Sequence, residues 1–296
     1  PTIMQNDRFK GLGVAMVTPF SSSKAIDYSA ADRLLEYLVD GGVDYLVVMG
    51  TTGEASTLTD DEKHELIAHV VEKNNGRLPI VLGVGGNCTS SVISSIKHFN
   101  LKGVDAILSV TPYYNKPTQK GLEMHFRAVA ESSPLPLILY NVPGRTGVNM
   151  SAQTTLTLAN EVPNIIGIKE ASGNLNQMAY ILRDRPDNFL VISGDDGLAL
   201  SQMAMGADGI ISVVGNAVPG RFAEMVHFAQ KGKFAEAAVI HLKLVELIDA
   251  LFVEGNPGGV KAALSILGII DNNLRLPLVP VGEATLQKLN MLLKSL

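Results

Sequence analysis

Cysteine, clustered positive charge and long apolar runs are all scarce in this sequence. Cys88 is the only cysteine, which excludes an intrachain disulfide and a cysteine-based zinc site and fits a reducing compartment. The 24 basic residues are outnumbered by 29 acidic ones and form no cluster that would neutralise a run of phosphates, so no nucleic acid partner is expected. No segment approaches the ~20 apolar residues of a membrane span, and residues 1–10 lack the apolar core of a secretion signal. We expect a soluble, cytoplasmic protein that does not bind membranes.

A metal site is not expected either. The six histidines are scattered along the chain. His64 and His69 are one position too far apart for the H-E-x-x-H motif, so they would not share a helix face. Asp195 and Asp196 form an acidic pair, but the histidines provide no partner ligand for it.

Short, β-branched apolar runs are what the sequence has in abundance. Eight of them occur in the first 216 residues, at 14–18, 45–49, 80–84, 106–110, 137–140, 165–169, 190–193 and 209–213. Their interiors are nearly continuous in apolar residues, which is typical of parallel strands covered on both faces. Eight strands that alternate with helical segments predict an α/β fold, specifically a (β/α)8 TIM barrel.

Helix-start signals lie between these runs. Thr59 with Glu62 three positions later forms a capping box, and that helix should end near Gly76. Other helices are expected to start near Thr89, Thr118, Ser151, Asn174 and Pro219.

After the eighth run the chain shows only helical periodicity. The segment 235–251 is the clearest case, and Asn256-Pro257 is placed to start a further helix. We therefore predict a barrel domain with the active site over residues 1–230 and a C-terminal helical segment over residues 231–296.

The polar residues that close the apolar runs are the candidates for chemistry, because TIM barrels carry their active sites at the C-terminal ends of the strands. These candidates are Thr51, Thr52 and Glu54, Tyr113 and Tyr114, residues 140–145, Lys169 and Glu170, and Asp195 and Asp196.

Lys169 ends the sixth run and can point into the barrel mouth. Burial there would lower its pKa and leave a neutral amine that can attack a carbonyl. Taken alone, a lysine at a strand end more often reaches water or pairs with an acid such as the adjacent Glu170. Tyr140, on the neighbouring strand, favours the catalytic alternative because a phenol can relay the protons that carbinolamine formation requires. A buried tyrosine with a satisfied hydroxyl is the alternative for Tyr140.

Three further side chains suit a carboxylate substrate. Thr51 and Thr52 offer hydroxyls and turn amides to a small carboxylate, although an ordinary glycine turn is the alternative. Arg145, expected on a loop punctuated by proline and glycine, can bind a carboxylate with two parallel hydrogen bonds, although it can also be a solvated surface arginine. Since no glycine-rich run occurs near strands seven and eight, the substrate should lack phosphate.

Three segments, GTTGE at 50–54, YNVP at 140–143 and GIKEA at 167–171, resemble the dihydrodipicolinate synthase / N-acetylneuraminate lyase family of pyruvate-dependent barrels. The resemblance runs from about Gly11 to the C-terminus. TPYYN at 111–115 and Arg145 are similar to the synthases of the family and differ from the sialic acid lyases. The resemblance implies a class I aldolase-type lyase that condenses pyruvate with L-aspartate 4-semialdehyde in diaminopimelate and lysine biosynthesis.

The resemblance also implies roles for the pyruvate side of the site. Lys169 would form a Schiff base with pyruvate, and no other cofactor would be needed. Thr51 and Thr52 would hold the pyruvate carboxylate. Tyr140, Thr51 and Tyr114 would relay protons.

The remaining implied roles concern the second substrate and the assembly. Arg145 would clamp the semialdehyde carboxylate, the Ile211 backbone would face the keto acid, and Gly194 lies in a segment similar to one of the synthases. In the family, Tyr114 comes from the neighbouring subunit. A homo-oligomer, either a dimer or a dimer of dimers, is therefore expected.

Feedback inhibition by lysine is expected to be weak or absent. Asp60, Lys63 and Ser91 stand where lysine-inhibited members often carry two histidines and a glutamate, although Asn87 and Tyr113 match. Lys63 adds positive charge near an α-ammonium, and Ser91 removes an anion.

Two other functions stay open at this stage. A lyase or aldolase of the same family would act on a sugar-derived aldehyde, but Arg145 argues against a neutral polyol. A non-catalytic barrel that binds a keto acid would need a lost lysine or tyrosine, and Lys169 and Tyr140 are both present.

Overall fold

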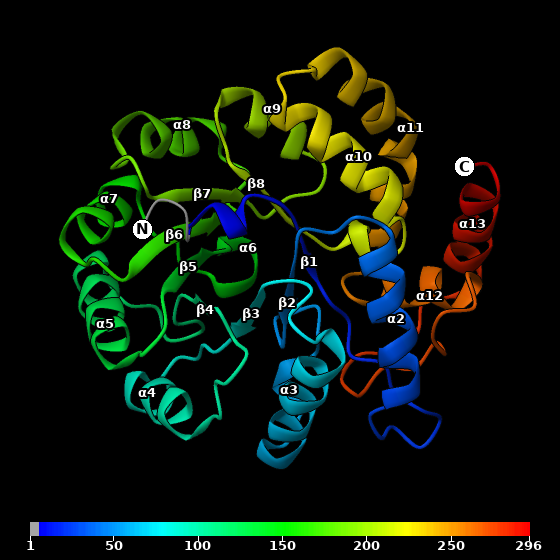
Figure 1. The fold of residues 1–296 in the computed structure, drawn as a ribbon, viewed down its shortest axis with the longest axis horizontal. Helices are drawn as coiled ribbons and strands as arrows, with labels where there is room; N and C mark the ends of the chain where they lie inside the picture. Colours follow the sequence, from blue (N-terminus) through cyan, green and yellow to red (C-terminus); the bar gives the residue numbers. More distant parts are fainter. Residues whose placement is uncertain (1–5) are drawn as a thin grey trace.

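A computed structural model describes residues 6–296 and shows the predicted (β/α)8 barrel (Figure 1). The strands are β1 (Gly11–Ala15), β2 (Tyr45–Val48), β3 (Ile80–Gly83), β4 (Ala106–Val110), β5 (Leu137–Asn141), β6 (Ile165–Glu170), β7 (Leu190–Ser193) and β8 (Gly209–Ser212). Each strand pairs in parallel with the next, and β8 pairs with β1, which closes the barrel. The predicted fold class is confirmed.

Helices surround the barrel on its outside (Figure 1). They are α2 (Tyr28–Asp40), α3 (Asp60–Asn74), α4 (Thr89–His98), α5 (Gln119–Ser132), α7 (Ala152–Glu161), α8 (Leu175–Asp184), α9 (Ala199–Met205) and α10 (Pro219–Gln230). The single-turn helix α6 (Pro143–Thr146) directly follows β5 and lies at the strand ends. Short 3-10 turns are η1 (Asp7–Phe9), η2 (Ala55–Thr57) and η3 (Val214–Asn216).

The predicted helix starts are confirmed. Thr59 and Glu62 form a reciprocal capping box at the start of α3. Thr118, Ser151 and Asn174 each cap a helix by accepting a hydrogen bond from a backbone N–H in its first turn. These side chains satisfy N–H groups that have no partner within the helix.

The first strand lies three residues earlier than the apolar pattern predicts. The prediction for 14–18 was wrong because Gly11 and Gly13 interrupt the apolar run. Gly13 is nevertheless required in the barrel: a Cβ atom there would lie 2.3 Å from Cζ of Tyr45 on β2. A residue without a side chain makes room for the fully buried ring of Tyr45 inside the barrel.

Side chains of the strands alternate between two buried layers. On β2, Tyr45 and Val47 point into the barrel, while Leu46 and Val48 pack against the helices. Because both faces are buried, the strands read as continuous apolar runs.

The C-terminal helices pack on one side of the barrel. They are α11 (Phe234–Phe252), α12 (Gly258–Ile266) and α13 (Glu283–Lys294), and α11 lies against α10 and α9 (Figure 1). The division proposed near residue 230 falls between α10 and α11 and stays a prediction.

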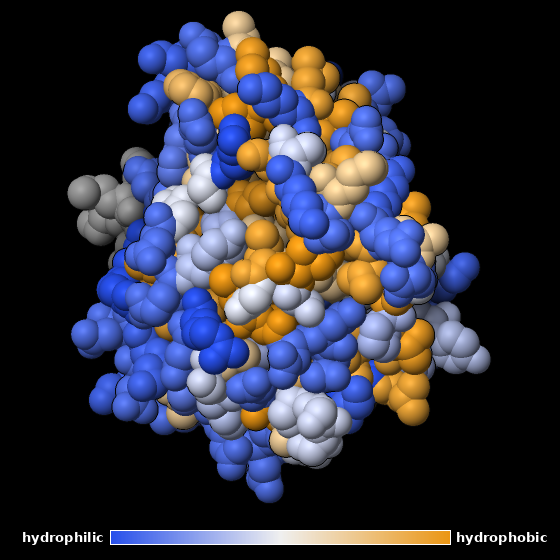
Figure 2. All heavy atoms as spheres, turned by 90° about the vertical axis from the view of Figure 1, so that its right-hand side faces the viewer, coloured by the Kyte–Doolittle hydropathy of each residue, from blue (hydrophilic) through white to orange (hydrophobic). Residues whose placement is uncertain are grey.

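Apolar side chains reach the surface on this side of the molecule, and Figure 2 shows them among charged ones. From α11 onward the exposed ones include Val239, Leu242, Val253, Leu276 and Val279. None of the helices formed by residues 6–296 has the length and apolar character to cross a bilayer.

Candidate active site

One cavity at the C-terminal ends of the strands collects most of the predicted site residues. It has a volume of about 470 Å³. Its lining includes Thr51, Thr52, Tyr140, Arg145, Lys169, Gly194 and Ile211. Residues from five strand ends therefore converge on one space, as the barrel topology requires.

Lys169 faces this cavity because β6 contains one extra residue. The pairing of β5 with β6 shifts between Leu137↔Ile165 and Ile138↔Gly167, so Ile166 is a bulge. Beyond the bulge, Lys169 is the direct neighbour of Tyr140. Without the extra residue, the alternation of side chains would turn Lys169 toward the helices.

The Lys169 side chain is buried against the ring of Tyr140. Its side chain is only 7% exposed, and its Nζ lies 4.1 Å from the centroid of the Tyr140 ring. The contact is with the face of the ring, which attracts a cation.

Glu170 does not pair with Lys169. Its carboxylate accepts hydrogen bonds from Asn141 Nδ2 at 3.1 Å and Gln177 Nε2 at 3.0 Å, and its pKa is raised by burial. The alternative in which the lysine pairs with the adjacent acid is therefore absent.

The absence of a side chain at Gly194 leaves room for the side chain of Lys169. A Cβ atom on Gly194 would lie 3.2 Å from Cε of Lys169 and 2.6 Å from Cβ of Ala171. Any other residue at this position would push against the lysine side chain. Ile211, on the neighbouring strand β8, is buried and also lines the cavity.

The turn after β2 presents both threonines to the cavity. Gly53 N donates to Gly50 O at 3.1 Å, and Glu54 N donates to Thr51 O at 3.0 Å. The Thr52 hydroxyl accepts a hydrogen bond from Asn256 Nδ2 at 2.9 Å. Since that hydroxyl already accepts one bond, its own proton is free to be donated to a carboxylate.

Arg145 lies on a helix, and the loop predicted for it was wrong. Pro143 occupies the first turn of α6, and Gly147 ends that helix in the left-handed conformation with φ 79°. The proline and glycine that suggested a loop are the start and stop signals of a single helical turn. Arg145 is exposed at the rim of the cavity, and the ion pairs among residues 6–296 do not include it.

Tyr114 is the one predicted site residue outside this cavity. Its side chain is 90% exposed, and its backbone is in the left-handed region with φ 70°. The structure therefore does not bring Tyr114 into the cavity of its own chain.

Of the two aspartates after β7, Asp196 has a structural role. This carboxylate is buried and accepts hydrogen bonds from the Ser212 hydroxyl and from the backbone N–H groups of Val213 and Val214. Burial raises the pKa of Asp196 to about 6. Within residues 6–296, no three histidine, cysteine or acidic side chains gather as a metal site would require.

Residues from the C-terminal segment also line the cavity, and no signal in the sequence predicted them as site residues. They are Ile248, Asp249, Phe252, Val253 and Asn256. The sequence predicted a helix start at Asn256-Pro257, but that local signal did not indicate where this segment lies relative to the barrel.

Two other cavities differ from this one in their lining. A hollow of about 320 Å³ beside the site is lined in part by Thr51, Ser56, Lys63, Tyr113 and Tyr140.

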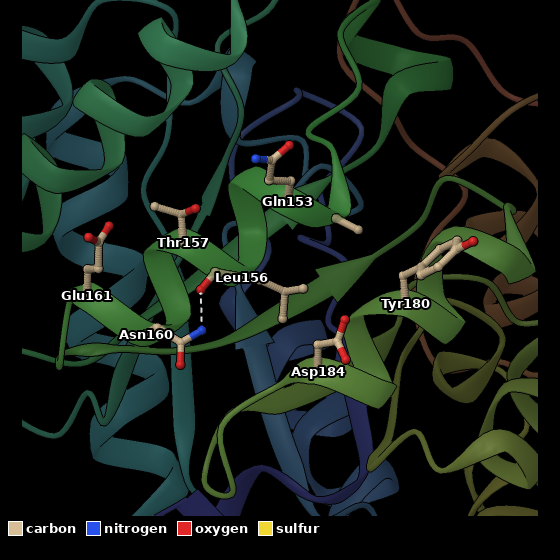
Figure 3. A pocket seen from close by; sticks show the side chains of 8 residues that line it. Gln153, Leu156, Thr157, Asn160, Glu161, Tyr180 and Asp184 are labelled. Atoms are coloured by element: carbon tan, nitrogen blue, oxygen red, sulfur yellow. Dashed lines mark hydrogen bonds between the residues drawn. The ribbon is translucent and has the colours of Figure 1, made fainter.

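The second hollow, of about 650 Å³, lies between α7 and α8 on the outer surface (Figure 3). Gln153, Thr157 and Glu161 border it from one helix, and Tyr180 and Asp184 from the other. None of the predicted site residues lines it.

Comparison with known proteins identifies the family to which the chain is similar. The dihydrodipicolinate synthetase family matches the chain over residues 8–296. The 4-hydroxy-tetrahydrodipicolinate synthase of Parabacteroides distasonis is 52% identical over 293 residues, which cover 99% of this chain and 99% of that one. The enzyme of the same name from Phocaeicola vulgatus is 51% identical with the same coverage.

Solved structures agree with the sequence relatives. The dihydrodipicolinate synthase of Thermotoga maritima has a TM-score of 0.95 at 40% identity and covers 97% of this chain and 98% of its own. The chloride-inhibited enzyme of Acinetobacter baumannii, solved with pyruvate, has a TM-score of 0.93 at 42% identity and covers 96% and 98%.

Proposed function

Because the chain belongs to the dihydrodipicolinate synthetase family, we propose that Lys169 performs the family's chemistry as a Schiff-base nucleophile toward pyruvate. The function is that of a 4-hydroxy-tetrahydrodipicolinate synthase, a lyase-type enzyme of diaminopimelate and lysine biosynthesis. The single observation that supports the lysine is its position, buried in the cavity against Tyr140 and away from the adjacent acid.

The first step makes the iminium. Thr51 and Thr52 bind the pyruvate carboxylate while the Lys169 amine forms a bond to C2. The keto oxygen takes up protons relayed by Tyr140 and leaves as water. The resulting cation lies over the Tyr140 ring, whose face favours positive charge.

The second step makes the carbon–carbon bond. The iminium acidifies the methyl group of pyruvate, and loss of a proton gives an enamine. The enamine carbon adds to the aldehyde of L-aspartate 4-semialdehyde, whose carboxylate Arg145 binds at the rim. The amine of the product then attacks C2, forms the ring and releases Lys169, so no metal or other cofactor is required.

Borohydride reduction tests the lysine directly. Reduction in the presence of pyruvate should leave a stable adduct, and peptide mass mapping should place it on Lys169. Lys169→Arg is the control and should give no adduct. An adduct on a different lysine, or none in the parent protein, would overturn the assignment.

Lysine feedback is proposed to be weak. Lys63 lines the hollow beside the site and brings a positive charge toward any bound amino-acid ammonium. A titration of the activity with lysine should show no strong inhibition at sub-millimolar concentrations, and strong inhibition there would contradict the proposal.

A cytoplasmic location is also proposed. It is supported by Cys88, an exposed free thiol, which fits a reducing compartment.

A further inference from the structure

A fully buried lysine lies outside the catalytic cavity and close to the turn that binds the substrate carboxylate. Lys261, on α12, is 0% exposed, and its Nζ lies 2.5 Å from Oε2 of Glu54. The same ammonium donates to the backbone oxygen of Asn273 at 2.9 Å and lies 4.2 Å from the centroid of the Phe20 ring. A buried charge is costly without a partner, so this ammonium and the Glu54 carboxylate depend on each other.

Glu54 is the last residue of the turn that carries Thr51 and Thr52. It is almost fully buried, and its backbone is left-handed with φ 54°, a conformation that is unfavourable for a residue with a side chain. The second carboxylate oxygen accepts the backbone N–H of Arg275 at 3.1 Å. Two residues of the C-terminal segment therefore hold the carboxylate, and this compensates for the strained backbone.

The start of α12 contacts the same turn at a second place. Asn256, two positions before the helix, donates from Nδ2 to the Thr52 hydroxyl. Its Oδ1 is buried and has no hydrogen-bond partner among residues 6–296. The helix α12 and the residues just before it therefore contact the turn at Thr52 and again at Glu54.

The charge of Lys261 at neutral pH supports an ion pair with Glu54. Burial lowers the pKa of Lys261 to about 8, while the carboxylate of Glu54 acts in the opposite direction. Lys24 and Arg275 are the other charged groups that act on this ammonium. Near pH 7 the lysine therefore remains a cation.

We propose that Lys261 is a positioning residue of the enzyme: through its ion pair with Glu54 it holds Thr51 and Thr52 in the conformation that binds the pyruvate carboxylate. The inference rests on the proposed role of that turn in the Schiff-base reaction. It makes the C-terminal helices part of the substrate site.

A pair of variants separates positioning from mere stability. Lys261→Met removes the ammonium but leaves the Glu54 carboxylate buried and alone, which can prevent folding. The double variant Glu54→Gln with Lys261→Met buries no charge, and the glutamine can still accept from Arg275 N. Lys243→Met, at an exposed position on α11, is the matched control.

The readout is the Michaelis constant of each substrate. In the folded double variant, the KM for pyruvate should rise about tenfold or more while the KM for the semialdehyde changes less than about twofold. Borohydride trapping on Lys169 should be retained at saturating pyruvate, and Lys243→Met should behave as the parent does. A purely structural role would lower the fraction of active enzyme, and hence kcat, with both KM values unchanged.

Other outcomes overturn the inference. A double variant with the parent KM for pyruvate contradicts it, and so does an equal rise in both KM values. Failure of the parent protein to form any adduct on Lys169 would instead show that the proposed function itself is wrong.

Discussion

Burial controls what each ionisable side chain around the cavity can do. Lys169 is buried beside the Tyr140 ring, and the carboxylate of its neighbour Glu170 is hydrogen-bonded to Asn141 and Gln177, so the proposed nucleophile does not form an ion pair with that acid. Asp196 is equally buried but receives three hydrogen bonds, which hold the end of β8 beside the substrate space. Arg145 is exposed at the rim, where a substrate carboxylate can replace water around its guanidinium.

Arg145→Ala should affect the two substrates unequally. Because Arg145 is proposed to bind only the semialdehyde, the KM for that substrate should rise by about tenfold or more, while the KM for pyruvate should change little. Steady-state kinetics with each substrate varied in turn measures both. An equal change in the two constants would contradict a role as a carboxylate clamp.

Asp196→Asn should alter the pH dependence of stability. The pKa of Asp196 is raised from 3.8 to about 6 in the folded protein, so between these values the folded state holds a proton that the unfolded state has lost. The stabilisation from this group is therefore present below pH 3.8 and is lost as the pH rises through about 6. Between pH 4 and 7 the free energy of unfolding of the parent, relative to that of Asp196→Asn, should fall by about 2 kcal/mol.

Urea denaturation at a fixed protein concentration across this pH range measures the difference. Lost hydrogen bonds in the variant add an offset that does not depend on pH. A difference that stays constant from pH 4 to 7 would show that Asp196 does not titrate in this range.

Two elements, β6 and α12, position the side chains of the proposed site, and each depends on a local feature of its backbone. In β6, one bulged residue turns Lys169 inward, and Gly167 lets the bulged strand approach β7 because a Cβ atom there would lie 2.7 Å from Cβ of Leu190. In α12, Gly259 packs so close to α11 that a Cβ atom would lie 2.0 Å from the backbone oxygen of Leu251. This contact sets the position of α12, and so of Lys261 and Asn256.

Gly259→Ala should displace α12 and destabilise the folded protein. The added methyl group meets backbone and not a flexible side chain, so the free energy of unfolding should fall by about 3 kcal/mol and the KM for pyruvate should rise. Gly258→Ala is the control, because a Cβ atom there would lie 3.5 Å from Cγ1 of Val281, an ordinary contact. Denaturation and kinetics of both variants test this, and equal stability of the two would refute it.

Across the whole molecule, the exposed Tyr114 gives a reason for assembly. Tyr114 is 90% exposed with φ 70°, so its side chain adds little stabilising burial to an isolated chain. We propose that in a homo-oligomer, a dimer or a dimer of dimers, Tyr114 of one copy reaches the cavity of a second copy and relays protons there.

Mixed subunits test this arrangement. Lys169→Ala and Tyr114→Phe should each lower kcat strongly, the second by about 100-fold. Mixing the two variants should restore activity, because hybrid dimers contain one site with both an intact Lys169 and an intact Tyr114 from the other chain. If Tyr114 acts within its own chain, mixing restores nothing.

The sequence by itself determined the alternation of strands and helices, the barrel, and the strand ends at which Lys169, Tyr140 and the threonine turn lie. Apolar periodicity and helix caps are local, so they can be read over a few residues. It also predicted which side chains can share one site, because the C-terminal ends of all the strands meet at one end of a closed barrel.

Only the tertiary structure decided the features that depend on distant contacts. The bulge that turns Lys169 inward appears only when β5 and β6 are paired. The contacts of Lys261 with Glu54 and of Asn256 with Thr52 join residues 207 and 204 positions apart, and no local pattern marks them. The residues around Lys261 in the sequence do not indicate that it is buried. Its partner Glu54 comes close only when the barrel closes and α12 packs beside the turn after β2.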